Sequence, residues 1–362
     1  MKNIFAHLAQ KLKEKLPLAL ATIIETKGST PQVTGASALF SSKGLLVGTL
    51  GGGILEADAR KKALHALKEK TFFLFRFSLR EDVSSKEGAI CGGEVRVLID
   101  GAPEKYKDVF HVLSRSLCQR KPGILATFIN EHPQEKASIL RFWIEKKVKY
   151  GTEMEKHFSF FQKEIKEVFG EEKPRLMKIR ENIFPEKAMN NLLFLEPVFP
   201  LPQLLIAGAG HVGQALTHLG NLLDFEVIVV DDRTEFANEE RLLDADQIIV
   251  DDIAKAVGKF PISSDTYVVI VTRGHRHDAA ALRACISSEA AYIGMIGSVR
   301  KVELMRKEFL EEGWATLRQF GRVHAPIGLP IYSETVEEIA VSIAAQLVKV
   351  RRQIQGRRKE SK

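Results

Sequence analysis

Three glycines in one short stretch have the spacing of a phosphate-binding turn. Gly208, Gly210 and Gly213 fit the pattern G-x-G-x-x-G, with an apolar run before them and a helical pattern after them. The first glycine allows a tight turn, the second lets a phosphate approach, and the third lets the helix pack on the strand. The amides and dipole of a helix that begins near His211 favour an anion. We therefore predict that these four residues bind a nucleotide phosphate.

An acidic residue stands where such a site meets a ribose. The next apolar run, 227–230, ends in Asp231, which lies roughly 20 residues beyond Gly208. At this spacing a carboxylate accepts hydrogen bonds from ribose hydroxyls. If the ligand is a nicotinamide dinucleotide, Asp231 favours NAD, whereas Arg233 keeps NADP open.

Later apolar runs also end in polar loops that belong to the predicted site. A parallel sheet binds its ligands beyond the carboxyl ends of its strands. We therefore predict that the site also includes Arg273, His275, Gly297 and Ser298.

The loop that contains Arg273 has a second interpretation as a metal site. His275, His277 and Asp278 lie close together in the sequence, but a firm zinc site draws ligands from separate segments as well. We favour anion binding through Arg273 or Arg276, or capping of the following helix by Asp278.

The N-terminal half contains two further candidate groups. Gly51, Gly52 and Gly53 lie between a predicted strand and a predicted helix. Such a turn exposes backbone amides to a ligand, and it serves equally as a tight turn with close helix packing. Cys91 lies between glycines on a loop that enters a strand. Its thiol is either a reactive group beside a ligand or a small buried side chain.

Composition restricts the class of protein. The chain has 362 residues, 45% hydrophobic and 27% charged, which is ordinary for a soluble globular protein. The net charge of +7 comes partly from the basic tail, and no basic patch with interleaved aromatic residues predicts nucleic-acid binding. The apolar runs are too short for a membrane helix, and the three cysteines lie far apart. We expect a cytoplasmic protein without a disulfide framework.

The order of the elements predicts two domains. A mixed α/β domain, 1–200, precedes a Rossmann-like, doubly wound parallel sheet, 201–362, and a proline-rich stretch near 170–200 marks the boundary. Predicted helices cover 4–16, 53–67, 104–120, 156–169 and 333–353, with another beginning at 300. Predicted strands cover 18–25, 37–40, 45–48, 72–78, 94–100, 123–129, 139–144, 191–196, 204–207, 227–230, 247–250, 267–271 and 291–296.

Several separated segments resemble the XdhC/CoxI family, which comprises accessory factors for xanthine dehydrogenase and related molybdenum hydroxylases. The resemblance is clear over 18–100 and 203–350, and weak over 101–200. The segments that carry it are 25–31, 48–56, 91–95, 208–213, 230–233, 292–298 and 322–329.

The resemblance implies a chaperone that binds the molybdenum cofactor, supports its sulfuration and helps to insert it into an apo-hydroxylase. The cofactor is molybdopterin or its dinucleotide form, and Cys91 matches a C-G-G motif whose thiolate would suit molybdenum or sulfur transfer. The implied partners are a xanthine dehydrogenase-type apo-hydroxylase and a cysteine desulfurase. A homodimer stays open, because a cleft shared by the two glycine-rich turns can form within one chain or between two. In this interpretation the glycine turn at 208–213 is half of a two-domain cleft that also includes Gly51, Gly52, Gly53 and Cys91.

A second function stays open at this point. A Rossmann domain also suits an NAD(P)-dependent oxidoreductase. No general acid–base pair for hydride transfer stands out in the sequence. We therefore favour a cofactor-binding maturation factor over an enzyme with turnover.

Overall fold

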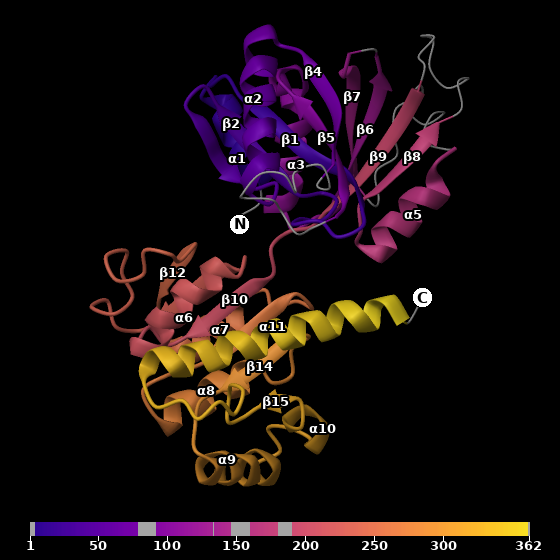
Figure 1. The fold of residues 1–362 in the computed structure, drawn as a ribbon. Helices are drawn as coiled ribbons and strands as arrows, with labels where there is room; N and C mark the ends of the chain where they lie inside the picture. Colours follow the sequence, from indigo (N-terminus) through magenta and orange to yellow (C-terminus); the bar gives the residue numbers. More distant parts are fainter. Residues whose placement is uncertain (1–3, 79–91, 133, 146–159, 180–189, 361–362) are drawn as a thin grey trace. The chain divides into compact units, whose positions relative to one another are not determined.

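The computed structural model describes residues 4–78, 92–132, 134–145, 160–179 and 190–360. The chain divides between Pro200 and Leu201 into two compact units, called here the N-terminal unit and the C-terminal unit. Figure 1 shows the helices and strands of both units.

The N-terminal unit is built on one antiparallel sheet. Its described strands have the spatial order β3-β2-β1-β5-β4-β7-β6-β9-β8, and every neighbouring pair is antiparallel. The strands are β1 (Ala19–Lys27), β2 (Ser37–Ser41), β3 (Gly44–Gly48), β4 (Phe72–Ser78), β5 (Glu94–Asp100), β6 (Gly123–Glu131), β7 (Lys136–Glu145), β8 (Arg175–Ile179) and β9 (Asn190–Val198).

Helices cover both faces of this sheet. Successive side chains of a strand point to opposite faces, so Leu20 packs with α1 (Ile4–Lys13) and α3 (Lys107–Cys118), whereas Ala19 and Ala21 pack with α2 (Gly53–Glu69). Val168 of α5 (Gln162–Glu171) packs over β6 and β9. A 3₁₀ turn, η2 (Pro103–Tyr106), precedes α3 and occupies the start of the predicted helix 104–120.

The C-terminal unit has the predicted doubly wound parallel sheet. The strand order is β12-β11-β10-β13-β14-β15, and all the pairs are parallel. The chain order along this sheet reverses between β10 and β13, and doubly wound sheets bind their ligands at the carboxyl ends of strands at such a reversal. The strands are β10 (Gln203–Ala207), β11 (Glu226–Asp231), β12 (Gln247–Val250), β13 (Thr266–Ile270), β14 (Tyr292–Met295) and β15 (Val323–His324).

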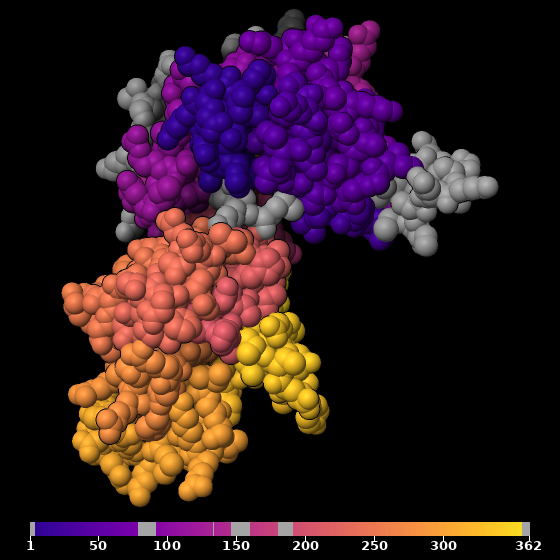
Figure 2. All heavy atoms as spheres, turned by 90° about the vertical axis from the view of Figure 1, so that its left-hand side faces the viewer, coloured from indigo at the N-terminus to yellow at the C-terminus, as the bar shows by residue number. Residues whose placement is uncertain are grey.

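Burial on both faces explains why these strands are continuous apolar runs. Leu204 and Ile206 face one core, formed with α6 (His211–Leu222) and α11 (Val336–Glu360). Leu205 and Ala207 face the other core, formed with α7 (Ile253–Lys259), α8 (His275–Cys285) and α9 (Val299–Glu311). The short helix α10 (Leu317–Phe320) follows α9. Figure 2 shows α11, in yellow, standing out on the surface of the unit. Among the helices of the described residues, none is long and apolar enough to cross a membrane.

Candidate nucleotide site

Two glycines of the turn between β10 and α6 are required by packing. Gly208 has φ +117°, and a Cβ there would lie 2.5 Å from the carbonyl oxygen of Val271. A Cβ at Gly213 would lie 2.0 Å from the carbonyl oxygen of Gly208. Both distances are shorter than any normal contact, so Gly208 makes the turn and Gly213 lets α6 approach the strand, as their positions in the motif predict.

Gly210 has a different environment. It caps α6 with an extended backbone, φ −67° and ψ −172°, and without a side-chain hydrogen bond. A Cβ at this position would meet no atom within 4 Å. His211, the first residue of α6, has an exposed side chain. The chain itself therefore places no demand for glycine at position 210, and the open space suits a ligand that approaches the first amides of the helix.

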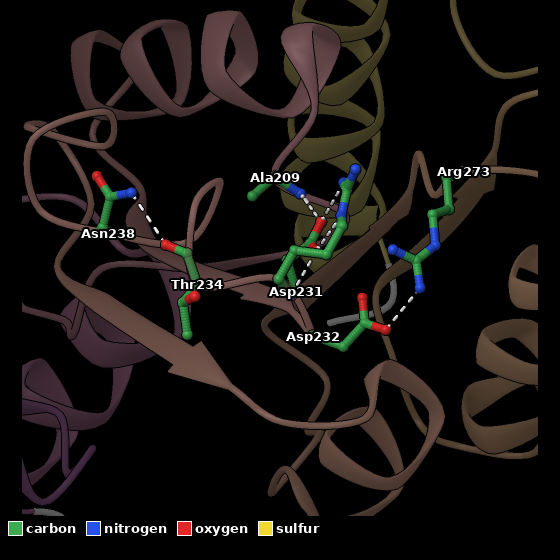
Figure 3. A network of polar contacts seen from close by, with 7 residues as sticks. Ala209, Asp231, Asp232, Thr234, Asn238 and Arg273 are labelled. Atoms are coloured by element: carbon green, nitrogen blue, oxygen red, sulfur yellow. Dashed lines mark hydrogen bonds and ion pairs between the residues drawn. The ribbon is translucent and has the colours of Figure 1, made fainter.

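Asp231 is buried behind this turn with both carboxylate oxygens engaged. Oδ2 accepts the amide of Ala209 at 2.8 Å and Nη2 of Arg233 at 2.9 Å. Oδ1 accepts the amide and Nε of Arg233 at 3.0 and 2.9 Å (Figure 3). The side chain of Asp231 is 1% exposed. The residue thus ties the end of β11 to the glycine turn.

The surroundings of Asp231 favour its ionised form. Burial alone would raise its pKa, but hydrogen bonds from the Arg233 side chain and from the amides of Ala209 and Arg233 outweigh that effect. The pKa of Asp231 falls to about 2. The guanidinium of Arg233 also stacks on the ring of Phe236, with its Cζ 3.8 Å from the ring centroid. The guanidinium of Arg233 is therefore held at its edge by Asp231 and on its planar face by Phe236.

Arg273 pairs with the acid next to Asp231. Its Nη2 lies 2.7 Å from Oδ2 of Asp232, and both side chains are partly exposed, at 43% and 33%. Asp232 follows β11 and Arg273 follows β13, the two strands that flank β10. The pair therefore joins the two loops on either side of the glycine turn (Figure 3).

An ion pair of partly exposed Lys301 with buried Asp278 lies between the ends of β13 and β14. Asp278 is fully buried and forms an ion pair with Lys301. Its Oδ1 accepts the amide and hydroxyl of Thr272 at 3.1 and 2.6 Å. The prediction that Asp278 caps α8 is wrong: Gly274 caps the helix without a side-chain bond, and Asp278 lies inside the first turn of the helix and bonds to Thr272.

The remaining predicted residues of this edge have local roles in the structure. His275 begins α8, and its Nε2 lies 3.6 Å from a carboxylate oxygen of Glu308. Ser298 caps α9 by accepting the amide of Lys301 at 3.3 Å. A Cβ at Gly297 would lie 3.1 Å from the Lys301 side chain. Among the described residues, no group of three His, Cys, Asp or Glu side chains is placed to hold a metal ion.

The glycine-rich turn of the N-terminal unit gathers three sequence segments. A Cβ at Gly51 would lie 2.8 Å from the Pro31 side chain, and one at Gly93 would lie 2.3 Å from the carbonyl oxygen of Ser29. Gly52 and Gly53 have φ +74° and +58°, and a Cβ at either would meet no atom within 4 Å. Segments 28–31, 51–53 and 92–93, which all carry the family resemblance, therefore belong to one local assembly. Cys91 lies outside the described residues.

Backbone amides of this second turn already donate hydrogen bonds to a carboxylate. Oε2 of Glu56 accepts the amides of Leu50 and Gly52 at 3.0 and 3.3 Å, and the hydroxyl of Thr49 at 2.7 Å. The Thr49 hydroxyl oxygen in turn accepts the amide of Gly51. The turn thus has an internal anion.

Sequence reasoning did not assign roles to Glu56, Asp232 or Lys301. The role of Glu56 could have been predicted, because a glutamate in the first turn of a helix often accepts hydrogen bonds from the backbone amides that precede it. Asp232 and Lys301 meet their partners only through the fold, since those partners are 41 and 23 residues away.

Two family models match the chain. The model of the XdhC Rossmann domain matches residues 204–347, and the model of the XdhC and CoxI family matches residues 12–78.

Two curated proteins and one solved structure are similar over almost the whole chain. "Uncharacterized protein YqeB" of Escherichia coli (strain K12) is 25% identical over 98% of this chain and 47% of its own length, so the chain spans about half of that relative. A protein of Bacillus subtilis (strain 168), described as a probable subunit of xanthine dehydrogenase, is 26% identical over 98% of this chain and 99% of its own length. A crystal structure of a xanthine dehydrogenase from Bacillus halodurans has a TM-score of 0.74 and 26% identity, and covers 98% of this chain and 96% of that chain.

Proposed function

The chain belongs to the XdhC and CoxI family, and we propose that it binds the molybdenum cofactor and helps to mature a xanthine dehydrogenase-type molybdenum hydroxylase. Relatives whose names refer to xanthine dehydrogenase support the choice of hydroxylase. Support for the cofactor comes from the family resemblance together with the nucleotide-binding geometry of the C-terminal unit.

The open space beside Gly210 is the main support for this function. Packing accounts for Gly208 and Gly213, but a side chain at Gly210 would meet only open space. A phosphate or pyrophosphate of the cofactor fits there, because the first amides of α6 and the helix dipole favour an anion. When bound, the cofactor supplies a dithiolene-held molybdenum centre. The residues of this chain hold its phosphate end.

Two finer parts of the proposal concern sulfur and assembly. We propose that the protein supports sulfuration of the cofactor, with Cys91 as the candidate thiol. A cysteine desulfurase partner and a homodimer remain predictions. Co-purification with the desulfurase and gel filtration of the full chain are their direct tests.

A charged side chain at position 210 tests the proposal directly. The full-length protein, purified without oxygen, should carry pterin and molybdenum and should activate an apo-hydroxylase. Gly210→Asp should lose both properties, since the new carboxylate occupies and repels the phosphate position. Gly356→Asp in α11 is the matched control, because a Cβ there also meets no atom within 4 Å.

Two results would contradict this function. One is a wild-type protein without pterin or molybdenum whose Gly210→Asp variant activates the hydroxylase equally well. The other is a bound nicotinamide dinucleotide that is reduced or oxidised with turnover while no pterin is present, which would favour an oxidoreductase. Unchanged circular dichroism of both glycine variants would show that loss of ligand is not loss of fold.

A further inference from the structure

Asp231 has no acceptor capacity left for a ribose. An ionised carboxylate offers about four acceptor positions, and Asp231 already accepts two hydrogen bonds at each oxygen. A ribose hydroxyl would have to displace Arg233 or the amide of Ala209 from a carboxylate that is 1% exposed. Its geometry is that of a positioning residue for the glycine turn.

The side chain of Arg233 is also engaged with Asp231. Its Nε and Nη2 both donate to Asp231, and its face lies on the ring of Phe236. An arginine at this position holds a 2′-phosphate in proteins that bind NADP. Here two of the five N–H donors of this guanidinium already bond to a buried carboxylate, which fixes its position at Asp231.

Asp232 has the exposure that Asp231 lacks. One third of its side chain is exposed, and its carboxylate reaches Arg273 at a single oxygen, Oδ2. Figure 3 shows the Asp232 carboxylate turned toward Arg273, away from the carboxylate of Asp231. Its remaining acceptor positions are therefore open at the end of β11, where a ribose lies when a phosphate occupies the glycine turn.

We propose that Asp232 is the ribose-recognising carboxylate of this site and that Arg273 contacts a phosphate of the same ligand. This inference rests on the proposed function and narrows its ligand to a dinucleotide form of the cofactor, with a free 2′,3′-diol on its ribose. The Asp232–Arg273 pair holds the two side chains together until the ligand supplies a hydroxyl to one and an anion to the other. A 2′-phosphate is excluded because it would meet the negative charge of Asp232.

Nucleoside diphosphates serve as probes of the ribose contact. Titration calorimetry on the full-length protein compares CDP, GDP and ADP with their 2′,3′-dideoxy counterparts. Hydrogen bonds to a charged group are strong, so the wild type should prefer the ribose form of at least one base by about 10-fold or more. Asp232→Ala should reduce that preference to less than about 2-fold. Asp251→Ala removes a similar exposed carboxylate at the end of β12 and should leave the preference unchanged.

Asp231→Asn separates the two neighbouring acids. It should lower stability but keep the ribose preference in the folded protein. Loss of the preference in Asp231→Asn with retention in Asp232→Ala would overturn the inference, and so would a wild type that shows no ribose preference or binds none of the diphosphates.

Pterin and molybdenum content, measured on the same samples, distinguishes the inference from the proposed function. A protein that retains pterin and molybdenum without any ribose preference would disprove the role of Asp232 alone. A protein with a ribose preference that never carries pterin would disprove the proposed function instead, and the role of Asp232 would then apply to another nucleotide.

Discussion

Both units contain a glycine-rich turn between a strand and a helix, and the two turns differ in where the nearby carboxylate lies. In the N-terminal unit, Glu56 belongs to the helix itself and accepts the amides of Leu50 and Gly52. In the C-terminal unit, Asp231 comes from the neighbouring strand and holds the turn from behind, through the amide of Ala209. An anionic ligand at the first turn would meet a fixed negative charge, whereas at the second it would meet the positive end of a helix dipole.

The difference teaches that a glycine-rich sequence identifies a tight turn of the backbone and does not by itself show that the turn binds a ligand. Gly52 has φ +74°, which by itself requires glycine, whereas Gly210 has an ordinary φ of −67°. The backbone geometry of the chain explains the first glycine, whereas at the second neither the backbone nor packing requires glycine. The phosphate of the proposed ligand is therefore proposed to bind in the C-terminal unit.

Buried acids show a second contrast between the units. Burial raises the pKa of Glu196 to about 8, against a smaller opposing effect of Arg141. For Asp231, burial is outweighed by hydrogen bonds, and the pKa falls to about 2. The first acid is therefore stable as a neutral group and the second as an anion.

One tryptophan in each unit makes these contrasts measurable. Of the two tryptophans in the chain, Trp143 lies in the N-terminal unit and Trp314 in the C-terminal unit. In the variant Trp314→Phe, the fluorescence of the remaining Trp143 reports unfolding of the N-terminal unit. In the variant Trp143→Phe, the fluorescence of Trp314 reports unfolding of the C-terminal unit. Each variant is therefore measured in the background that reports on its own unit.

Glu196→Gln should produce the largest effect, and only in the N-terminal unit. Between pH 4.5 and about 8 the folded unit keeps a proton that the unfolded chain has released, so its stability falls as pH rises through this range. The change is at most about 5 kcal/mol. Glu196→Gln should remove the part of this dependence that is due to Glu196 and leave the part due to Asp100, whose pKa burial also raises, as urea unfolding at pH 5 and pH 9 would measure. A wild-type unit with equal stability at both pH values would contradict the contrast.

A series of glycine-to-alanine variants should separate packing, backbone and ligand requirements. Gly213→Ala should destabilise the C-terminal unit by about 3 kcal/mol, because its Cβ would overlap the carbonyl oxygen of Gly208. Gly52→Ala should cost about 1 to 3 kcal/mol in the N-terminal unit, since its backbone, with φ +74° and ψ −167°, disfavours a Cβ. Gly210→Ala should cost less than about 1 kcal/mol, the difference between glycine and alanine at a helix N-cap. Urea midpoints check all three, and a large loss for Gly210→Ala would mean that position 210 is structural.

The two turn carboxylates should respond differently when neutralised. Asp231→Asn should destabilise the C-terminal unit by about 2 kcal/mol at pH 7, the value that a pKa of about 2 instead of 3.8 implies. The wild type should lose this contribution as pH falls from about 4 to 2, and the variant should not.

Glu56→Gln should cost the N-terminal unit only about 1 kcal/mol, since the amide oxygen still accepts the same donors without the charge. Urea unfolding of both variants, with Asp251→Asn as a control for a lost exposed charge, measures the difference. Equal losses for the two variants would show that the position of the carboxylate does not matter.

Much of the fold follows from short-range pattern, and the exceptions are instructive. Strands buried on both faces are apolar throughout, so the C-terminal sheet was predictable, as the parallel β10 to β14 confirm. β8 was not predicted, because Arg175–Ile179 is a short edge strand. Only three of its five residues are apolar, so it forms no continuous apolar run. The order of the described N-terminal strands was also not predictable, since β1 pairs with β5, β4 with β7 and β6 with β9, and these strands are not consecutive in the chain.

The sequence by itself determined the glycine turn, the doubly wound sheet and the position of an acid after the second strand of that sheet. These depend on steric limits and burial patterns that act within one strand, turn and helix. Only the tertiary structure decided that Asp231 is saturated by Arg233 and Ala209, that Asp232 reaches Arg273, and that Gly210 faces open space. Those facts depend on which side chains meet across neighbouring strands, and such meetings are set by packing of the whole unit.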